Sequence, residues 1–218
     1  ILFVSVNHTK HFFFSQAFSL GKMVAFMSVF IYFGVALKLP VYLDHHATTP
    51  LDPRVFQKMM PYFIEHFGNA ASRTHSYGWI AEEAVEQARS HVAMAIGANK
   101  EEIIFTSGAT EANNLAIKGV AESYQNKGRH IITVSTEHAC VLDTCEYLQQ
   151  AGFDVTVLEV DHDGLLDPQK INNAIRNDTV LVSVLLANNE TGVIQDIAAI
   201  GAITREKGIL LHTDAAQA

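Results

Sequence analysis

Hydrophobic patterns of the helix type and of the strand type alternate along the chain after Lys38. Apolar residues at helical spacing predict helices at 53–65, 76–96, 110–126, 139–151, 168–176 and 196–207. Short apolar runs rich in β-branched residues predict strands at 102–106, 130–135, 154–159, 179–186 and 209–213. From residue 102 onward the chain therefore follows a β-α-β order.

The predicted strands are expected to be parallel, because a full helix separates each one from the next. Gly128, Gly152 and Gly208 each fall between a helix and the following strand, as helix C-terminal caps do. The nearly unbroken apolar run 180–186 is typical of a strand that is covered on both faces. We predict an α/β domain of three layers with a mostly parallel sheet.

The segment before Lys38 has a different pattern, and residues 23–37 contain no charged side chain. A membrane-spanning helix needs about 20 apolar residues, so this run is short for one. Three interpretations remain open: an anchor or targeting segment, an apolar helix of the fold, and non-native sequence joined upstream of the true start. We favour the last, and we leave membrane association of residues 1–37 open. The predicted division is 1–38 as an apolar extension, 39–52 as an N-terminal arm and 53–218 as the large domain.

Composition and charge exclude some classes of function. The chain is 49% hydrophobic and 17% charged, which is typical of a globular protein. A net charge of −8 without a basic run argues against nucleic acid as a partner. Cys140 and Cys145 match no zinc pattern, so we predict no metal site and a reduced, cytoplasmic compartment.

Polar residues follow the predicted strands at the edge where parallel α/β sheets bind ligands. The small and hydroxyl residues at 106–110 (TSGAT) open a helix, where backbone N–H groups can hold a phosphate. An ordinary helix start rich in capping residues is the alternative interpretation. The polar turn 188–192 (NNETG) is either a simple loop or a binding partner for the ring hydroxyl of a cofactor.

Two further residues have a functional and a structural interpretation each. His138 opens a helix, where its ring can lie against a planar cofactor or transfer a proton, or can simply cap that helix. Asp214 ends an apolar strand, where it can pair with a protonated ring nitrogen or cap the next helix. Gln217, three residues later, can reach the same ring as a hydrogen-bond donor.

Six segments together resemble the cysteine desulfurases in order and spacing: 41–53 (VYLDHHATTPLDP), 67–78 (FGNAASRTHSYG), 105–119 (FTSGATEANNLAIKG), 136–145 (TEHACVLDTC), 187–197 (ANNETGVIQDI) and 212–218 (HTDAAQA). The resemblance implies the type I pyridoxal 5'-phosphate (PLP) fold of the class V aminotransferase group. It further implies a homodimer that converts L-cysteine to L-alanine and an enzyme persulfide. The sulfur would pass to an acceptor or scaffold protein for iron–sulfur cluster assembly or thio-modification.

The resemblance also implies a role for particular residues, which agrees with the roles considered from the residues themselves. The implied cofactor partners are Ala109 and Thr110 for the phosphate, His138 for the ring face, Asn189 and Gln217 for the ring hydroxyl, and Asp214 for the ring nitrogen. His138 is in addition the candidate catalytic residue.

Three features of the family have no counterpart in the printed sequence. They are the Schiff-base lysine in a Ser-x-His-Lys segment, the sulfur-accepting cysteine of a mobile loop, and the arginine that holds the substrate carboxylate. We therefore expect a C-terminally truncated large domain that is inactive by itself. The alternatives are a selenocysteine lyase or another class V aminotransferase-fold enzyme, and a non-catalytic remnant of a PLP fold.

Overall fold

The computed structural model describes residues 40–218, so the predictions for residues 1–38 lie outside the described part. The described residues divide into two compact units after Pro50, and one of these units contains residues 51–218. Within the described part, no helix has both the length and the apolar character that crossing a bilayer requires.

The centre of this unit is a sheet of four parallel strands in the order β2-β1-β3-β4. The strands are β1 (His130–Val134), β2 (Asp154–Leu158), β3 (Thr179–Ser183) and β4 (Leu210–His212). All four lie within predicted strands, and the parallel arrangement is confirmed. The β1 and β3 strands are buried along their whole length, which confirms the prediction made for the run that contains β3.

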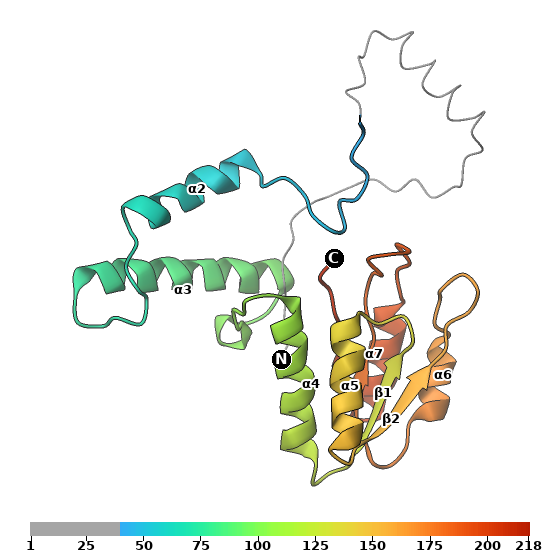
Figure 1. Cartoon of the computed structure of the whole chain (residues 1–218). Coiled ribbons are helices and arrows are strands. Elements are labelled where there is room, and N and C mark those ends of the chain that lie inside the picture. Colours follow the sequence, from blue (N-terminus) through green and yellow to red (C-terminus); the bar gives the residue numbers. More distant parts are fainter. Residues whose placement is uncertain (1–39) are drawn as a thin grey trace, which may run out of the picture. The chain divides into compact units, whose positions relative to one another are not determined.

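Helices cover both faces of the sheet, which gives three layers (Figure 1). One face packs on α4 (Ala109–Tyr124) and α5 (Ala139–Gln150), the other on α6 (Pro168–Ala174) and α7 (Ile197–Glu206). Neighbouring residues of a strand point to opposite faces, so Ile131 belongs to the first core and Ile132 to the second. The predicted three-layer α/β architecture is confirmed.

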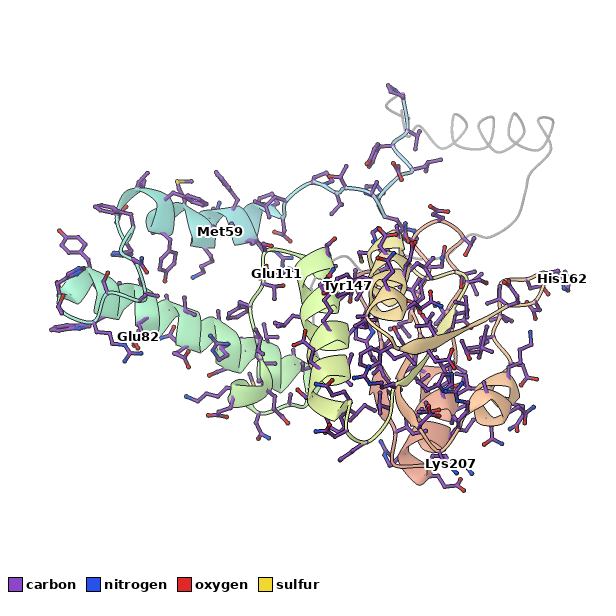
Figure 2. The ribbon with its side chains drawn as sticks, turned by 60° about the horizontal axis from the view of Figure 1, so that its bottom comes forward. Met59, Glu82, Glu111, Tyr147, His162 and Lys207 are labelled. Atoms are coloured by element: carbon purple, nitrogen blue, oxygen red, sulfur yellow. The ribbon has the colours of Figure 1, made fainter. Side chains whose placement is uncertain are left out.

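Two more helices precede this core, α2 (Pro53–Ile64) and α3 (Ser76–Ile96). Asp52 caps α2 through the N–H of Arg54, and Gly97 ends α3 in the left-handed conformation at φ 70°. No residue of α2 is buried. Its exposed apolar side chains are Val55, Phe56, Met59, Met60, Tyr62, Phe63 and Ile64, and Figure 2 labels Met59.

The strand predicted at 102–106 is wrong. A 3-10 turn, η1 (Lys100–Glu102), comes first, and residues 103–106 belong to no strand. A strand needs a neighbour to accept and donate its backbone hydrogen bonds, and no strand of the described part pairs with this segment. The carbonyl of Ile103 instead accepts a hydrogen bond from the Arg89 guanidinium.

Candidate active site

A pocket of about 400 Å³ opens between α4 and α5, and all its lining residues belong to these two helices or to the N-cap of α5. Thr110 of α4 and His138 at the start of α5 both line it, so the fold brings these two predicted residues together. Lys118 and Tyr147 line it too, with the lysine Nζ 4.5 Å from the centre of the tyrosine ring. Figure 2 shows Tyr147 on α5 beside α4.

The start of α4 is built to receive a negative group. Gly108 is the N-cap residue, and helix geometry leaves the N–H groups of Ala109 and Thr110 without intrahelical acceptors. Glu111 turns back to accept from the N–H and Oγ of Ser107 at 2.7 and 2.6 Å, and these bonds lower its carboxyl pKa. The N–H groups of Ala109 and Thr110 thus suit a phosphate at the positive end of the helix.

His138 both caps a helix and faces the pocket. Its Nδ1 accepts a hydrogen bond from the N–H of Cys140 at 3.2 Å and lies 3.1 Å from the Cys140 Sγ. An accepting Nδ1 carries no proton, so the neutral ring holds its proton on Nε2. The capping interpretation is therefore confirmed for one nitrogen, while the exposed ring lines the pocket.

Asp214 lies two residues after the end of β4 and is 5% exposed. Its Oδ1 accepts from the N–H of Ala216 at 3.0 Å, and its Oδ2 accepts from Nδ2 of Asn113 at 2.7 Å. None of the ion pairs within residues 40–218 includes this carboxylate. A buried anion without a cation is costly, so the site fits a cofactor whose ring nitrogen is protonated.

Asn113 is a site residue that sequence reasoning missed. It lies on α4, is 4% exposed, and joins three elements through one amide group. Its Nδ2 reaches Asp214 and, at 3.3 Å, the Sγ of Cys140, and its Oδ1 lies 3.2 Å from Nε2 of His212. The sequence did contain a signal for Asn113. It lies three residues before Ala116 and four before Ile117, so it is a polar residue on an otherwise apolar face of the helix.

His212, at the end of β4, completes this chain of contacts. Its Nδ1 lies 2.8 Å from the hydroxyl of Ser183 on β3. Burial lowers the pKa of His212 to about 4, so the ring is neutral at physiological pH. A polar row therefore runs through Ser183, His212, Asn113 and Asp214.

Glu137, next to His138, is a second buried carboxyl group. Its Oε1 accepts from the N–H of Leu185, and its Oε2 has no hydrogen-bond partner among the described residues. Burial, with a smaller contribution from Asp214, raises the pKa of Glu137 to about 8, so the group is protonated at neutral pH. The strand predicted at 179–186 ends at Ser183 in the structure. Leu185, which lies within the predicted range, donates its N–H to Glu137.

Asn189 and Gln217 lie in the turns that follow β3 and β4. The neighbouring Asn188 holds the first turn: its Oδ1 accepts from the N–H groups of Glu190 and Thr191, and its Nδ2 donates to the carbonyl of Thr136. That last bond, at 2.9 Å, ties the turn to the end of β1. The roles of Asn189 and Gln217 at a ring hydroxyl stay predictions.

A larger cavity, about 580 Å³, lies at the opposite ends of β3 and β4. Lys127, Arg176 and Lys207 line it, but Arg176 is already paired with Asp154 and Asp178. The C-terminal ends of α4, α6 and α7 meet there, and helix C-termini carry negative partial charge. We therefore place the candidate active site at the carboxyl ends of the strands.

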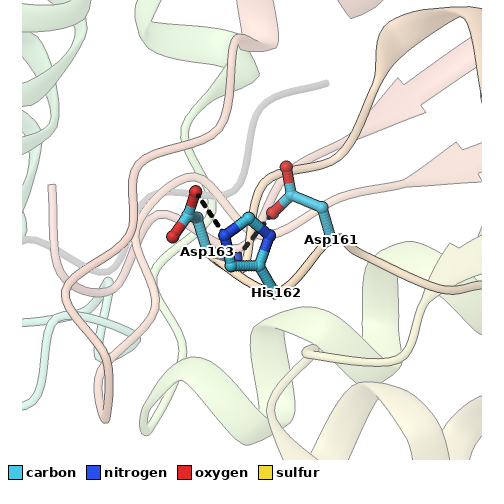
Figure 3. A group of neighbouring side chains, drawn as sticks. All are labelled: Asp161, His162 and Asp163. Carbon is cyan, nitrogen blue, oxygen red and sulfur yellow. Dashed lines mark hydrogen bonds and ion pairs between the residues drawn. The ribbon is translucent and has the colours of Figure 1, made fainter.

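One further cluster has side chains of the type that bind metals. Asp161, His162 and Asp163 are consecutive exposed residues of the loop after β2 (Figure 3). Asp161 Oδ1 accepts from the N–H groups of Asp163 and Leu165, so it already holds the turn of its own loop. His162 Nε2 lies 3.3 Å from an Asp163 oxygen. We assign no metal site to this loop.

Comparisons with known proteins agree with this geometry. The family model for aminotransferase class-V matches residues 41–218. The cysteine desulfurase IscS of Methylococcus capsulatus is 62% identical over 182 residues, which cover 84% of this chain and 45% of the relative. The IscS of Dechloromonas aromatica is 60% identical over 185 residues, covering 84% and 46%. The chain thus spans a little under half the length of these curated relatives.

Solved structures show the same fold. A structure described as SspA in complex with cysteine has a TM-score of 0.77 and 43% identity, covering 81% of this chain and 51% of that one. DndA from Streptomyces lividans has a TM-score of 0.72 and 43% identity, covering 81% and 49%. A NifS-like protein has a TM-score of 0.77 and 40% identity, covering 80% and 48%.

Proposed function

This chain belongs to the class-V aminotransferase family and is about 60% identical to cysteine desulfurases, and from that premise we propose that it forms the cofactor-binding part of such an enzyme. Enzymes of this family use PLP. The proposed reaction removes the sulfur atom of L-cysteine and leaves L-alanine and an enzyme persulfide. The observation that supports it best is the buried Asp214 carboxylate, which has no cation among the described residues.

Each part of the cofactor has a proposed partner in this chain. When bound, PLP supplies an electron sink for negative charge that develops on the substrate. The N–H groups of Ala109 and Thr110 would bind its phosphate, and the ring of His138 would lie on its face. Asp214 would keep the ring nitrogen protonated, and Asn189 and Gln217 would bind the ring hydroxyl. His138 would also exchange a proton at the pocket through Nε2.

Partners and location are part of the proposal. We propose L-cysteine as substrate, a homodimer, and a sulfur-acceptor or scaffold protein that supplies iron–sulfur cluster assembly or thio-modification in the cytoplasm. The solved relative with bound cysteine supports the substrate. The exposed apolar side chains of α2 support a subunit interface, because apolar surface of this kind usually marks a contact. The charge of −8 argues against nucleic acid.

A chimaera tests the function directly. Residues 41–218 are joined to the part of the Methylococcus capsulatus relative that follows the matched region, and the product is incubated with PLP, L-cysteine and a thiol reductant. We expect equal amounts of L-alanine and sulfide. Asp214→Asn removes the anion but keeps the shape, and should lower the rate at least about tenfold, the equivalent of 1.4 kcal/mol of transition-state stabilisation.

Two controls separate the alternatives. The relative's C-terminal part alone should release no alanine. L-selenocysteine in place of L-cysteine distinguishes a desulfurase from a selenocysteine lyase by the ratio of the two kcat/KM values. A soluble, folded chimaera that binds PLP but acts on neither substrate would favour the non-catalytic remnant, and one that binds no PLP would reject the cofactor assignment.

A further inference from the structure

We propose that Asn113 is a positioning residue that orients the Asp214 carboxylate toward the cofactor ring nitrogen and keeps that carboxylate free of any competing cation. This inference rests on the proposed function, because it concerns the site in which PLP would bind. It adds a residue on α4 to a site whose predicted members lie at helix starts and strand ends. The contacts of one buried amide support it.

The orientation of the Asn113 amide follows from its neighbours. The Asp214 carboxylate only accepts hydrogen bonds, so the Asn113 amide turns its Nδ2 toward Asp214, 2.7 Å away, and its Oδ1 toward His212. Nε2 of His212 then carries the ring proton, which leaves Nδ1 to accept from the Ser183 hydroxyl. The reversed amide would bring its oxygen against a carboxylate oxygen and its N–H against the Nε2 proton. Only one orientation therefore satisfies all the groups.

This arrangement sets the direction of the Asp214 carboxylate and brings no cation to it. One carboxylate oxygen is held by the Ala216 N–H and the other by the Asn113 amide. An ionised carboxylate has about four acceptor positions, so two remain for an incoming donor. Asn113 is neutral and donates without cancelling the negative charge. A lysine or arginine in its place would neutralise the anion that the ring nitrogen requires.

His212, on the other side of the Asn113 amide, also leaves Asp214 without a competing cation. A protonated imidazole would be a cation close to Asp214, and it would compete with a protonated ring nitrogen. Burial keeps the ring neutral, and the Ser183 hydroxyl satisfies the nitrogen that would otherwise take up a proton. The Sγ of Cys140, at 3.3 Å, accepts the second N–H of the Asn113 amide, which leaves no donor of that amide unpaired.

The test measures the cofactor and not the reaction. The full chain is titrated with PLP by fluorescence, and the protonation of the ring nitrogen is read from the ¹⁵N chemical shift of ring-labelled PLP. Asn113→Leu keeps the approximate volume and removes donor and acceptor together. We expect at least a tenfold rise in the Kd for PLP and a ¹⁵N shift moved toward that of the unprotonated ring.

Asn113→Asp adds a readout that a purely structural role would not produce. An aspartic acid at this position donates a hydrogen bond to Asp214 only while it is protonated. Once ionised, it repels the Asp214 carboxylate and raises the pKa of His212. The PLP affinity of Asn113→Asp should therefore approach that of the unchanged chain at low pH and fall as the pH rises. The exposed Asn173→Asp on α6 gives the same change in charge and should leave the affinity profile unaltered.

The outcomes are separable. If the unchanged chain binds no PLP, the proposed function fails before Asn113 is tested. If the unchanged chain binds PLP, while folded Asn113→Leu and Asn113→Asp both keep its Kd, pH profile and ¹⁵N shift, the positioning role is overturned. A misfolded Asn113→Leu, detected by circular dichroism, leaves Asn113→Asp at low pH as the deciding comparison.

Discussion

At the scale of single residues, the site contains two buried carboxyl groups in different surroundings. Asp214 receives two N–H donors, from Asn113 and Ala216, which suit an anion. Glu137 receives one, from Leu185, and its second oxygen has no acceptor or donor among the described residues. The first group is suited to hold a cationic ring, and the second is held neutral by burial.

Replacing Glu137 by glutamine tests that neutral state. The pKa is raised from 4.5 to about 8 in the folded chain, so the folded state binds more protons than the unfolded state between these values. Stability therefore falls as the pH rises from about 4.5 toward 8. Glutamine keeps the acceptor for Leu185 and does not ionise. Glu137→Gln should equal the unchanged chain near pH 5 and exceed it at pH 9, by at most about 1.4 kcal/mol per unit of pKa shift.

Urea unfolding at pH 5, 7 and 9 measures this difference. Asp163→Asn, which changes an exposed carboxylate in the loop after β2, is the control and should show no comparable rise with pH. A stability difference between Glu137→Gln and the unchanged chain that stays constant from pH 5 to pH 9 would contradict a protonated Glu137.

His138 has two functions that a pair of variants separates. His138→Ala removes the helix cap and the ring, whereas His138→Asn removes the ring but keeps a good N-cap residue for α5. Both should lower the desulfurase rate of the chimaera about 100-fold or more, the usual contribution of a positioned acid or base. Only His138→Ala should also lose about 1 kcal/mol of stability.

Steady-state kinetics and thermal unfolding of the two variants provide the comparison. Full activity in His138→Asn would reduce His138 to a capping residue.

At the scale of elements, the glycine between α4 and β1 is explained by close packing. A Cβ at Gly128 would lie 2.1 Å from the carbonyl oxygen of Asp178, the residue before β3. The sequence pattern predicts a helix C-terminal cap at Gly128, Gly152 and Gly208. Gly152 and Gly208 do adopt the left-handed φ of such caps, at 87° and 67°. Gly128 does not, so its requirement comes from the neighbouring strand connection.

Two alanine substitutions distinguish these effects. Gly128→Ala forces the connection away from β3 and should destabilise the chain by about 1 to 3 kcal/mol, the usual cost of overpacking. Gly119→Ala, in the middle of α4, meets no atom within 4 Å and should stabilise by about 0.5 to 1 kcal/mol, because alanine favours helix. Urea midpoints for the two variants should move in opposite directions, and a neutral Gly128→Ala would contradict the contact.

The failed strand prediction at 102–106 belongs to this scale as well. Its short apolar run rich in β-branched residues, Ile103 to Thr106, is the local pattern of a strand. Ile104 and Phe105 stay exposed at 42% and 48%, and the Arg89 guanidinium lies over the Phe105 ring, 4.9 Å from its centre. Local pattern specifies a candidate strand, but only a neighbouring strand completes it.

At the scale of the whole molecule, covalent attachment of PLP depends on the lysine side chains. Lys118 lines the candidate pocket, but its ammonium group lies over the Tyr147 ring of α5. We expect the isolated chain to bind PLP weakly and to retain none of it covalently after borohydride treatment. Mass spectrometry of the treated chain measures this.

A matched experiment with Lys118→Arg identifies the site of any attachment. Arginine keeps the charge over Tyr147 but forms no stable imine. A borohydride-stable adduct that appears on the unchanged chain and disappears in Lys118→Arg would overturn the expectation of an inactive chain. Lys207→Arg, on the exposed C-terminal end of α7, should change nothing.

Apart from the strand predicted at 102–106, the sequence by itself determined the order and type of the helices and strands, and it named most residues of the candidate site. Apolar periodicity and helix-ending glycines locate the helices around β1 to β4 within two residues, because those signals depend on neighbours along the chain. Thr110, His138 and Asp214 could be named in the same way, since ligands of parallel sheets lie beyond the carboxyl ends of strands.

Only the tertiary structure determined which residues far apart in the sequence contact each other. Asn113 reaches Asp214 across 101 positions of sequence, and His212 reaches Asn113 across 99, so neither contact has a local signal. The neutral states of His212 and Glu137 likewise arise from burial under elements far away in the chain. Patterns along a chain report local preferences, whereas the partner of a buried polar group is known only once distant segments are packed together.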